Sequence, residues 1–168
     1  ALYREILEKD AADGLAQTGL ILSLLGAEKR TEAEAEMNKS FEANPNNLVL
    51  LVGAAYWYAA HGEGAKAVEL AQQAVKIEPR YTWAHIALAR GFLQQKRPLD
   101  AERTLLAARQ YGNFPTLDYE IASARLQAGF FREASDILKT NFTVTGDTIK
   151  TNLGGRVSRE AAWTLCSV

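Results

Sequence analysis

The chain has 168 residues, 48% of them hydrophobic, which is typical of a folded protein. This length suits one globular domain or about four to five short repeats. The net charge of −1 argues against a general nucleic-acid-binding surface, although residues 1–45 are mildly acidic and residues 46–168 mildly basic.

One cysteine, Cys166, excludes an internal disulfide framework. No apolar run reaches the roughly 18 residues that a membrane-spanning helix needs, so we expect a soluble protein. No signal peptide is visible, and the chain starts at Ala1, without a methionine, inside a predicted helix. This start leaves room for an upstream segment that has been removed, so the sequence does not separate a cytoplasmic from an exported protein.

The first ten residues are predicted to be helical, because Leu2, Tyr3, Ile6 and Leu7 recur at the spacing of one helix face. This stretch matches the second helix of a helical pair whose first helix is absent from the sequence. Its apolar side chains therefore have only one neighbouring helix to cover them.

A pair of helices is predicted next, over residues 15–25 and 32–43. Asp13 is a suitable N-cap for the first of them, and Gly26 a suitable stop. Pro45 and the asparagines around it then break the helical pattern, because a proline disfavours helix at the residue before it.

Residues 48–79 and 82–113 are two copies of one pattern, each a helix, a short turn and a second helix. Matching residues lie 34 positions apart, as in the pairs Ala67 and Ala101, Ala74 and Ala108, Tyr58 and Phe92. Small residues recur where two helices cross closely, because only short side chains allow such an approach. A fixed period of this length indicates stacked helical repeats, each burying a face against the next.

A further unit is predicted over residues 116–141, with Ala134 lying 33 positions after Ala101. Arg125 stands where the earlier units have Tyr58 and Phe92. A charge at this position predicts either a partly open seam between the helices or a pairing with a carboxylate.

This pattern resembles the tetratricopeptide repeat family over residues 1–141. The residues that carry the resemblance are Ala54, Ala55, Tyr58, Ala67, Ala74, Pro79, Leu88, Ala89, Phe92, Ala101, Leu105 and Ala108, with weaker copies at Leu20, Ile21, Leu24, Ala33, Ile121, Ala122 and Ala134. The resemblance implies an all-α, right-handed solenoid of antiparallel helix hairpins. We expect a partial unit at 1–11 and full units at 14–45, 48–79, 82–113 and 116–141.

Residues 142–168 are predicted to form a separate tail. The stretch from Phe142 to Thr151 alternates apolar and polar residues around Gly146 and Asp147, which is typical of a short β-hairpin. A short helix is expected over 158–168.

Catalysis is not expected. The two histidines, His61 and His85, lie 24 positions apart, and Cys166 stands alone, so no metal-ligand spacing is present. No glycine-rich phosphate loop precedes a helix. We therefore expect no metal and no cofactor.

In the family that the chain resembles, the first helix of each unit lines a concave face. The resemblance therefore implies a non-catalytic scaffold that holds a peptide or helix of another protein. The residues expected to line the face are Val52, Tyr56, Trp83, Ile86, Arg90, Leu93, Gln94, Tyr119 and Ser123. Some relatives hold a terminal carboxylate with basic residues here, but only Arg90 could do so in this chain. Packing between helices is an equal alternative role for Tyr56, Trp83 and Tyr119.

Self-association is the alternative function. Leu2, Tyr3, Ile6 and Leu7 are its candidate contacts, and the acidic front and basic back of the chain favour a head-to-tail arrangement that closes into an oligomer or grows into a filament. Asn141 begins an Asn-Phe-Thr triplet and is a candidate glycosylation site if the protein is exported.

Overall fold

The computed structural model describes residues 2–10, 13–112, 114–145 and 148–151. These ranges are mainly helical and end in two short strands. The elements are α1 (Leu2–Lys9), α2 (Gly14–Gly26), α3 (Arg30–Ala43), α4 (Leu48–Ala60), α5 (Gly64–Ile77), α6 (Thr82–Gln94), α7 (Pro98–Ala108), the 3-10 helix η1 (Arg109–Tyr111), α8 (Pro115–Gln127), α9 (Phe131–Asn141), β1 (Phe142–Thr145) and β2 (Thr148–Thr151).

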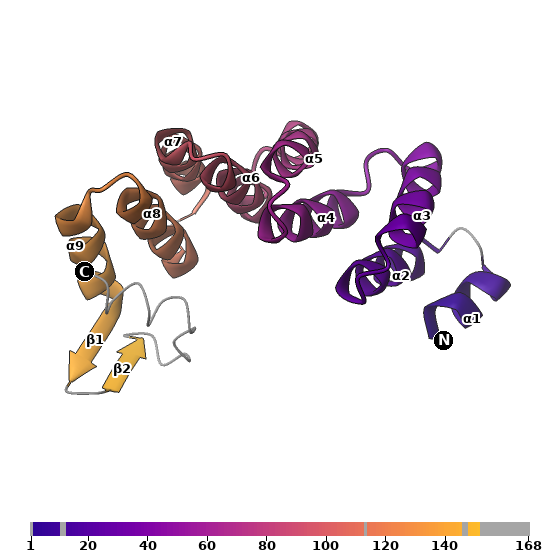
Figure 1. Cartoon of the computed structure of the whole chain (residues 1–168), viewed down its shortest axis with the longest axis horizontal. Helices are drawn as coiled ribbons and strands as arrows, with labels where there is room; N and C mark the ends of the chain where they lie inside the picture. The colour runs from indigo at the N-terminus through magenta and orange to yellow at the C-terminus, as the bar shows by residue number, and fades with distance from the viewer. Residues whose placement is uncertain (1, 11–12, 113, 146–147, 152–168) are drawn as a thin grey trace.

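Successive helices form hairpins that follow one another along an arch (Figure 1). The first helices of the hairpins, α2, α4, α6 and α8, lie along the inner side of the arch, and the second helices lie outside them. We call the exposed side of these first helices the inner face. This arrangement confirms the predicted all-α solenoid of helical hairpins.

The core follows the line of small residues that the sequence predicts. Ala54 and Ala55 of α4 and Ala67, Ala71 and Ala74 of α5 are all 0% exposed, because the two helices cross at these positions. The next helix approaches equally closely. A Cβ atom added to Gly91 of α6 would lie 2.8 Å from Val68 Cγ2 of α5, so a glycine is needed at this contact.

The turn inside each hairpin repeats one backbone conformation. Glu28, Gly62, Lys96 and Gly129 have φ angles of 59°, 85°, 60° and 85°, and each stands at the same place in its unit. Next to each of them, a backbone N–H bonds to the carbonyl five residues earlier at 2.9 Å, as in Lys29 to Leu24 and Arg97 to Phe92. This is the helix-ending motif in which a left-handed residue lets the chain reverse.

The strands β1 and β2 pair antiparallel, with Val144 opposite Ile149 and Thr145 opposite Thr148. The predicted turn residues Gly146 and Asp147 lie outside the described residues, as does the helix predicted over 158–168. Within the described ranges, every helix is too short or too polar to cross a membrane.

The left-handed turn gives the first prediction. Replacing Lys96 by glycine removes the Cβ atom from a position with φ of 60° and should raise the free energy of unfolding by about 0.5–1 kcal/mol. Replacing Gly129 by alanine should lower it by about 1 kcal/mol through backbone strain alone, since no atom lies within 4 Å of the added Cβ. Urea unfolding followed by circular dichroism measures both changes, and shifts of the same sign would contradict the role assigned to this turn.

Candidate interaction surface

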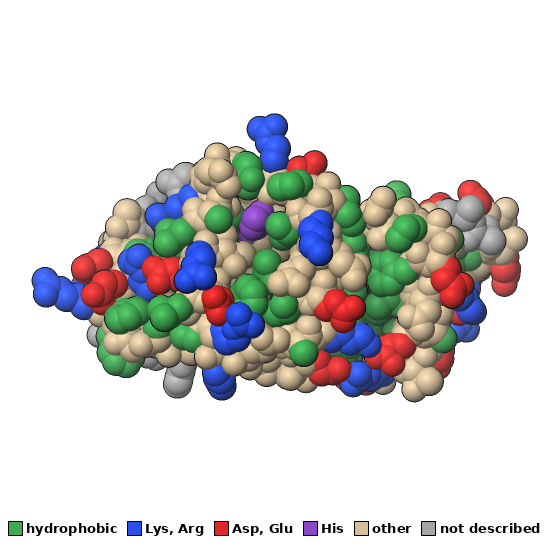
Figure 2. Space-filling view, turned by 90° about the horizontal axis from the view of Figure 1, so that it is seen from above, with side chains coloured by type: hydrophobic (Ala, Val, Ile, Leu, Met, Phe, Trp, Pro, Cys, Tyr) green, Lys and Arg blue, Asp and Glu red, His purple; other side chains and the backbone are tan. Residues whose placement is uncertain are grey.

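The first helices carry few charged residues. The spans of α2 and α4 contain none, that of α6 contains Arg90 alone, and that of α8 contains Asp118, Glu120 and Arg125. The second helices differ, since α3 alone carries six charged residues. Figure 2 shows the outer side of the arch, where basic and acidic side chains are scattered among hydrophobic ones. The charge of the helical array is therefore concentrated away from the inner face.

Arg90 is neutralised by a buried acid. Its Nε donates to Glu120 Oε1 at 3.0 Å, its Nη2 donates to the same oxygen, and Glu120 is only 2% exposed. Burial is the largest single influence on the pKa of Arg90 and lowers it, but the hydrogen bond to Glu120, the charge of Glu120 and the neighbouring tyrosines together raise the pKa above its usual value. Arg90 therefore stays charged and paired, whereas the sequence suggested a lone cation.

The ring of Tyr56 completes this cluster. The Arg90 guanidinium lies 4.8 Å from the centre of the ring, a cation–π contact. The Tyr56 hydroxyl is buried and has no hydrogen-bond partner among the described residues, and burial raises its pKa. Tyr56 thus contributes a neutral aromatic surface to the inner face.

The remaining charges of α8 are also paired. Asp118 accepts a hydrogen bond from Arg109, and Arg125 Nε donates to Glu102 Oε1 at 2.7 Å. The second contact confirms one of the two alternatives predicted for Arg125, the pairing with a carboxylate.

The residues predicted to line the concave face differ in how exposed they are in the structure. Trp83, Arg90 and Gln94 are exposed, and Tyr56, Leu93, Tyr119 and Ser123 are partly buried. Two assignments need correction: Val52 is 6% exposed and Ile86 1% exposed. Both belong to the buried core cluster, in which α4 and α6 pack against each other.

Three exposed apolar side chains recur along the array. Leu15, Val49 and Trp83 are 79%, 52% and 49% exposed, and each is the second residue of its first helix. They lie 34 positions apart, so the repeat places them in equivalent positions of successive units.

Leu15 was not predicted to line the face, although its spacing of 34 positions from Val49 could have indicated it. Glu120, which lies near the middle of α8, was also missed.

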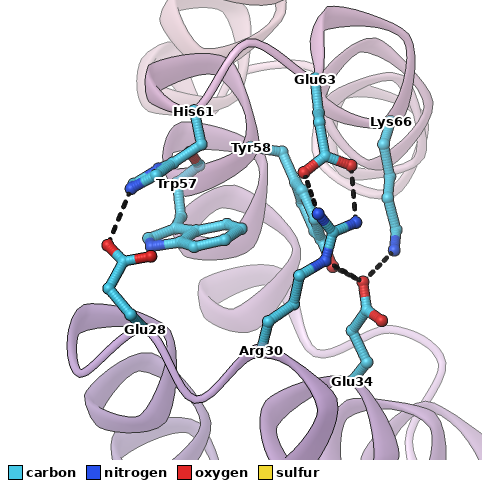
Figure 3. A network of polar contacts seen from close by, with 8 residues as sticks. All are labelled: Glu28, Arg30, Glu34, Trp57, Tyr58, His61, Glu63 and Lys66. Carbon is cyan, nitrogen blue, oxygen red and sulfur yellow. Dashed lines mark hydrogen bonds and ion pairs between the residues drawn. The ribbon is translucent and has the colours of Figure 1, made fainter.

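A polar network joins the first two hairpins (Figure 3). Glu34 of α3 accepts hydrogen bonds from Lys66 Nζ at 2.9 Å, from the Tyr58 hydroxyl at 3.0 Å and from Arg30 Nε at 3.1 Å. Arg30 also pairs with Glu63 at 2.7 Å. The hydrogen bond from Lys66 is the main reason that the pKa of Glu34 falls from 4.5 to about 2.

A second set of contacts lies beside this network. The ring of His61 stacks on Trp57 with centroids 4.0 Å apart. Its Nε2 is 3.2 Å from Glu28 Oε1, and its Nδ1 is 2.7 Å from the Trp57 carbonyl oxygen. Glu28 and Glu34 thus both reach across from the first hairpin to α4 or its following turn.

The low pKa of Glu34 gives the second prediction. Because its pKa is lower in the folded state, its stabilising contribution is present above about pH 4.5 and is lost as the pH falls towards 2. Since Glu34 is 33% exposed, solvent screening limits the effect, and Glu34→Gln should cost about 1 kcal/mol near neutral pH.

Urea unfolding at several pH values measures this cost, which should shrink below pH 4.5. Glu36→Gln is the matched control, because Glu36 forms an exposed pair with Lys39 on the same helix. If the cost of Glu34→Gln were constant across this pH range, the ionised Glu34 carboxylate would not be the source of the stabilisation.

The helix α1 covers one end of the array incompletely. Leu2 and Tyr3 are 66% and 38% exposed, whereas Ile6 and Leu7 are partly buried. The Tyr3 ring rests where a Cβ atom on Gly19 of α2 would collide with it. Two cavities of about 230 and 360 Å³ lie between α1 and α3 over a floor that includes Leu20.

Asn141, the candidate glycosylation site, is the last residue of α9 and directly precedes β1. Among the described residues, no group of three or more histidine, cysteine or acidic side chains could hold a metal ion.

The hairpin array and its neutral inner face are features of a helical-repeat interaction scaffold. Comparison with known proteins identifies the kind of repeat. The family model of the tetratricopeptide repeat matches residues 58–115. A search of curated protein sequences finds no match.

Solved structures agree with this match. A thermophilic tetratricopeptide repeat protein of Thermus thermophilus aligns with a TM-score of 0.70 and 19% identity, over 83% of this chain and 77% of that one. The PilF protein of Pseudomonas aeruginosa aligns with a TM-score of 0.72 and 16% identity, over 98% of this chain and 77% of that one. YrrB, described as a tetratricopeptide repeat protein with an unusual peptide-binding site, aligns with a TM-score of 0.65 and 15% identity, over 83% of this chain and 72% of that one.

Residues 58–115 thus match the tetratricopeptide repeat, as their repeat pattern indicated, and the fold of the chain is similar to that of solved tetratricopeptide repeat proteins. A fold of this kind suggests a scaffold for protein–protein interaction.

Proposed function

We propose that the chain is a non-catalytic scaffold that binds a segment of another protein along its inner face. The observation that carries this proposal is the row of exposed apolar side chains, Leu15, Val49 and Trp83, on helices almost free of charge. Exposed apolar surface of this kind, bordered by polar residues, is typical of protein-binding sites. The binding array in this proposal comprises residues 1–141, with 142–168 as a tail.

The charge of the inner face indicates what kind of segment would bind. The family resemblance suggested Arg90 as a candidate anchor for a carboxylate, but its guanidinium is held by Glu120. An acidic or carboxylate-ended peptide would therefore gain little here, because it would have to compete with the buried Glu120 carboxylate for the Arg90 guanidinium. The peptide-binding site described for YrrB supports binding of a peptide as the general class of function.

Trp83 is the strongest candidate anchor, because a large aromatic side chain supplies much of the binding energy at protein interfaces. With a partner captured by the intact chain and identified, Trp83→Ala should weaken binding by about 2 kcal/mol, roughly 30-fold in Kd. Calorimetry measures the affinity, and circular dichroism checks that the helical content is unchanged.

Leu106→Ala is the control for this experiment, because Leu106 is 41% exposed on α7, a second helix. It should leave the affinity unchanged. The opposite result, a loss with Leu106→Ala and none with Trp83→Ala, would move the binding surface to the outer side. Arg90→Ala is a poor test, since it would leave the buried Glu120 without its partner and destabilise the fold.

Self-association through α1 is the second candidate function. It is favoured by the exposure of Leu2 and Tyr3 at one end of the array, where a neighbouring copy could cover them. Contact between this end and the opposite end of a second copy would be head-to-tail, giving a ring or a filament.

Sedimentation at several concentrations tests this second candidate. If α1 mediates contact, the average mass should rise with concentration, and Leu2→Glu should abolish the rise. Leu99→Glu changes a leucine of similar exposure on α7 and should leave the rise intact. A chain that stays monomeric at roughly 100 micromolar, well above the micromolar Kd of modest contacts, would exclude self-association as the function.

A further inference from the structure

One position of the repeat carries an aromatic ring that lies between neighbouring hairpins. In the second hairpin this residue is Tyr58, which is 0% exposed. Its hydroxyl donates to Glu34 of α3 at 3.0 Å, and its ring centre lies 4.3 Å from Lys66 Nζ of α5. In the third hairpin the residue is Phe92, with the Arg97 guanidinium 4.7 Å from its ring centre. Both hairpins therefore hold an aromatic ring with a cation over it.

The first hairpin has a leucine at this position, and a cavity opens beside it. Leu24 lies 34 residues before Tyr58 and lines the larger of the two cavities next to α1, of about 360 Å³. We call this space the α1–α3 cavity. Its other walls are Arg4 of α1, Leu20 of α2, and Glu32, Ala35 and Glu36 of α3.

The lining of the α1–α3 cavity favours an aromatic occupant. A cavity of about 150 Å³ is already enough to hold benzene, so a phenyl ring fits. Arg4 could lie over such a ring, as the cations of the next two hairpins lie over theirs. Glu32 and Glu36 pair with Arg4 and Lys39, but their side chains remain 48% and 40% exposed. Both carboxylates are therefore accessible to a basic residue next to the ring.

The opposite end of the array presents two exposed rings. Phe130 and Phe131 are 45% and 57% exposed where the chain turns from α8 into α9. A hydrogen bond of 2.9 Å from the Phe130 N–H to the Arg125 carbonyl holds this turn. Packing of the repeat does not require phenylalanine here, because the equivalent residues of the earlier turns are charged, small or proline: Lys29 and Arg30, Glu63 and Gly64, and Arg97 and Pro98.

We propose that Phe131 of one copy of the chain inserts into the α1–α3 cavity of a second copy. Arg132, which directly follows and is exposed, then lies beside Glu32 and Glu36, so the charges at the contact are complementary. Because α1 and α9 lie at opposite ends of the arch (Figure 1), the contact is head-to-tail and repeats into a ring or a filament. This inference rests on the second candidate function, self-association through α1, and names the contact that it uses.

Sedimentation of the intact chain over a range of micromolar concentrations measures the contact, which is small and should therefore be weak and reversible. Phe131→Ala should weaken association by at least about 10-fold, since it removes the inserted ring. Phe114→Ala is the matched control. Phe114 is a phenylalanine of similar exposure, 48%, but it precedes α8 instead of α9, and its loss should change the association by less than about twofold.

The cavity is tested by filling it from within. Leu24→Phe places a ring where the next two hairpins have one, so it should raise the urea concentration at the unfolding midpoint. It should also weaken association by at least about 10-fold, because the ring of the second copy no longer fits. Ala35→Trp fills the same cavity from its exposed wall on α3 and serves as the second variant if Leu24→Phe destabilises the fold.

A mixture of two variants provides the sharpest test. The Phe131→Ala chain keeps its cavity, and the Leu24→Phe chain keeps its exposed phenylalanine. Each alone should stay monomeric, whereas an equimolar mixture should form a complex of two chains and nothing larger, because only one head-to-tail contact is left.

The outcomes separate this inference from the function on which it rests. Association that survives Phe131→Ala and Leu24→Phe but is lost with Leu2→Glu would overturn the inserted ring and leave self-association through α1 in place. A mixture of the two variants that stays monomeric would also overturn the inserted ring. A chain that is monomeric at roughly 100 micromolar would overturn both. If that monomer instead bound a phenylalanine-containing peptide, and Leu24→Phe abolished the binding, the cavity would belong to another protein and contact between copies would be excluded.

Discussion

The close crossing of helices at small residues is the constraint on which the rest of the structure depends. Ala54, Ala67 and Ala74 are fully buried where α4 and α5 cross, and Gly91 lets α6 approach Val68 of α5. A hairpin packed this closely has little apolar surface of its own and must cover its neighbour. Close crossings at small residues therefore hold the two helices of each hairpin together and also fix the position of the next hairpin. Side chains at equivalent positions of successive units then point in the same direction. Residues that are far apart in the sequence, such as Leu15, Val49 and Trp83, therefore form a row.

Charge is distributed according to the same constraint. The first helices are covered on several sides by other helices, so a charge there would be costly unless paired. Glu120 illustrates the rule: it is almost fully buried, and the Arg90 guanidinium accompanies it. The second helices have a solvent-facing side and carry most of the ionic side chains. The inner face is left apolar and nearly neutral as a consequence of how the helices pack.

Much of the fold could be predicted from the sequence. The spacing of apolar residues, the turn residues and the alanines at helix crossings all recur within a single repeat, so they can be recognised from residues close together in the chain. Contacts between repeats were harder. Glu34 meets Tyr58 and Lys66 from positions 24 and 32 residues away, and Arg90 meets Glu120 from 30 residues away. Nothing in one sequence pairs these residues, since any of several charged neighbours could serve. Val52 and Ile86 were placed on the surface for a related reason. Both residues lie in the core, where α4 and α6 come from different units and pack against each other.

The junction between the first two hairpins differs from the others. The helix α5 packs closely on α6, whereas α3 and α4 stay further apart, so the first two hairpins meet through a smaller apolar contact between α2 and α4 and through the polar network around Glu34 (Figures 1 and 3). In a linear array, the free energy of unfolding is shared between the individual units and the contacts between neighbours. A boundary with less apolar contact and more partly exposed ion pairs couples its two sides less strongly than one built mainly from buried apolar surface. The segment from α1 to α3 should therefore behave as a separate cooperative unit, opening more often than the rest and exchanging its amide hydrogens sooner.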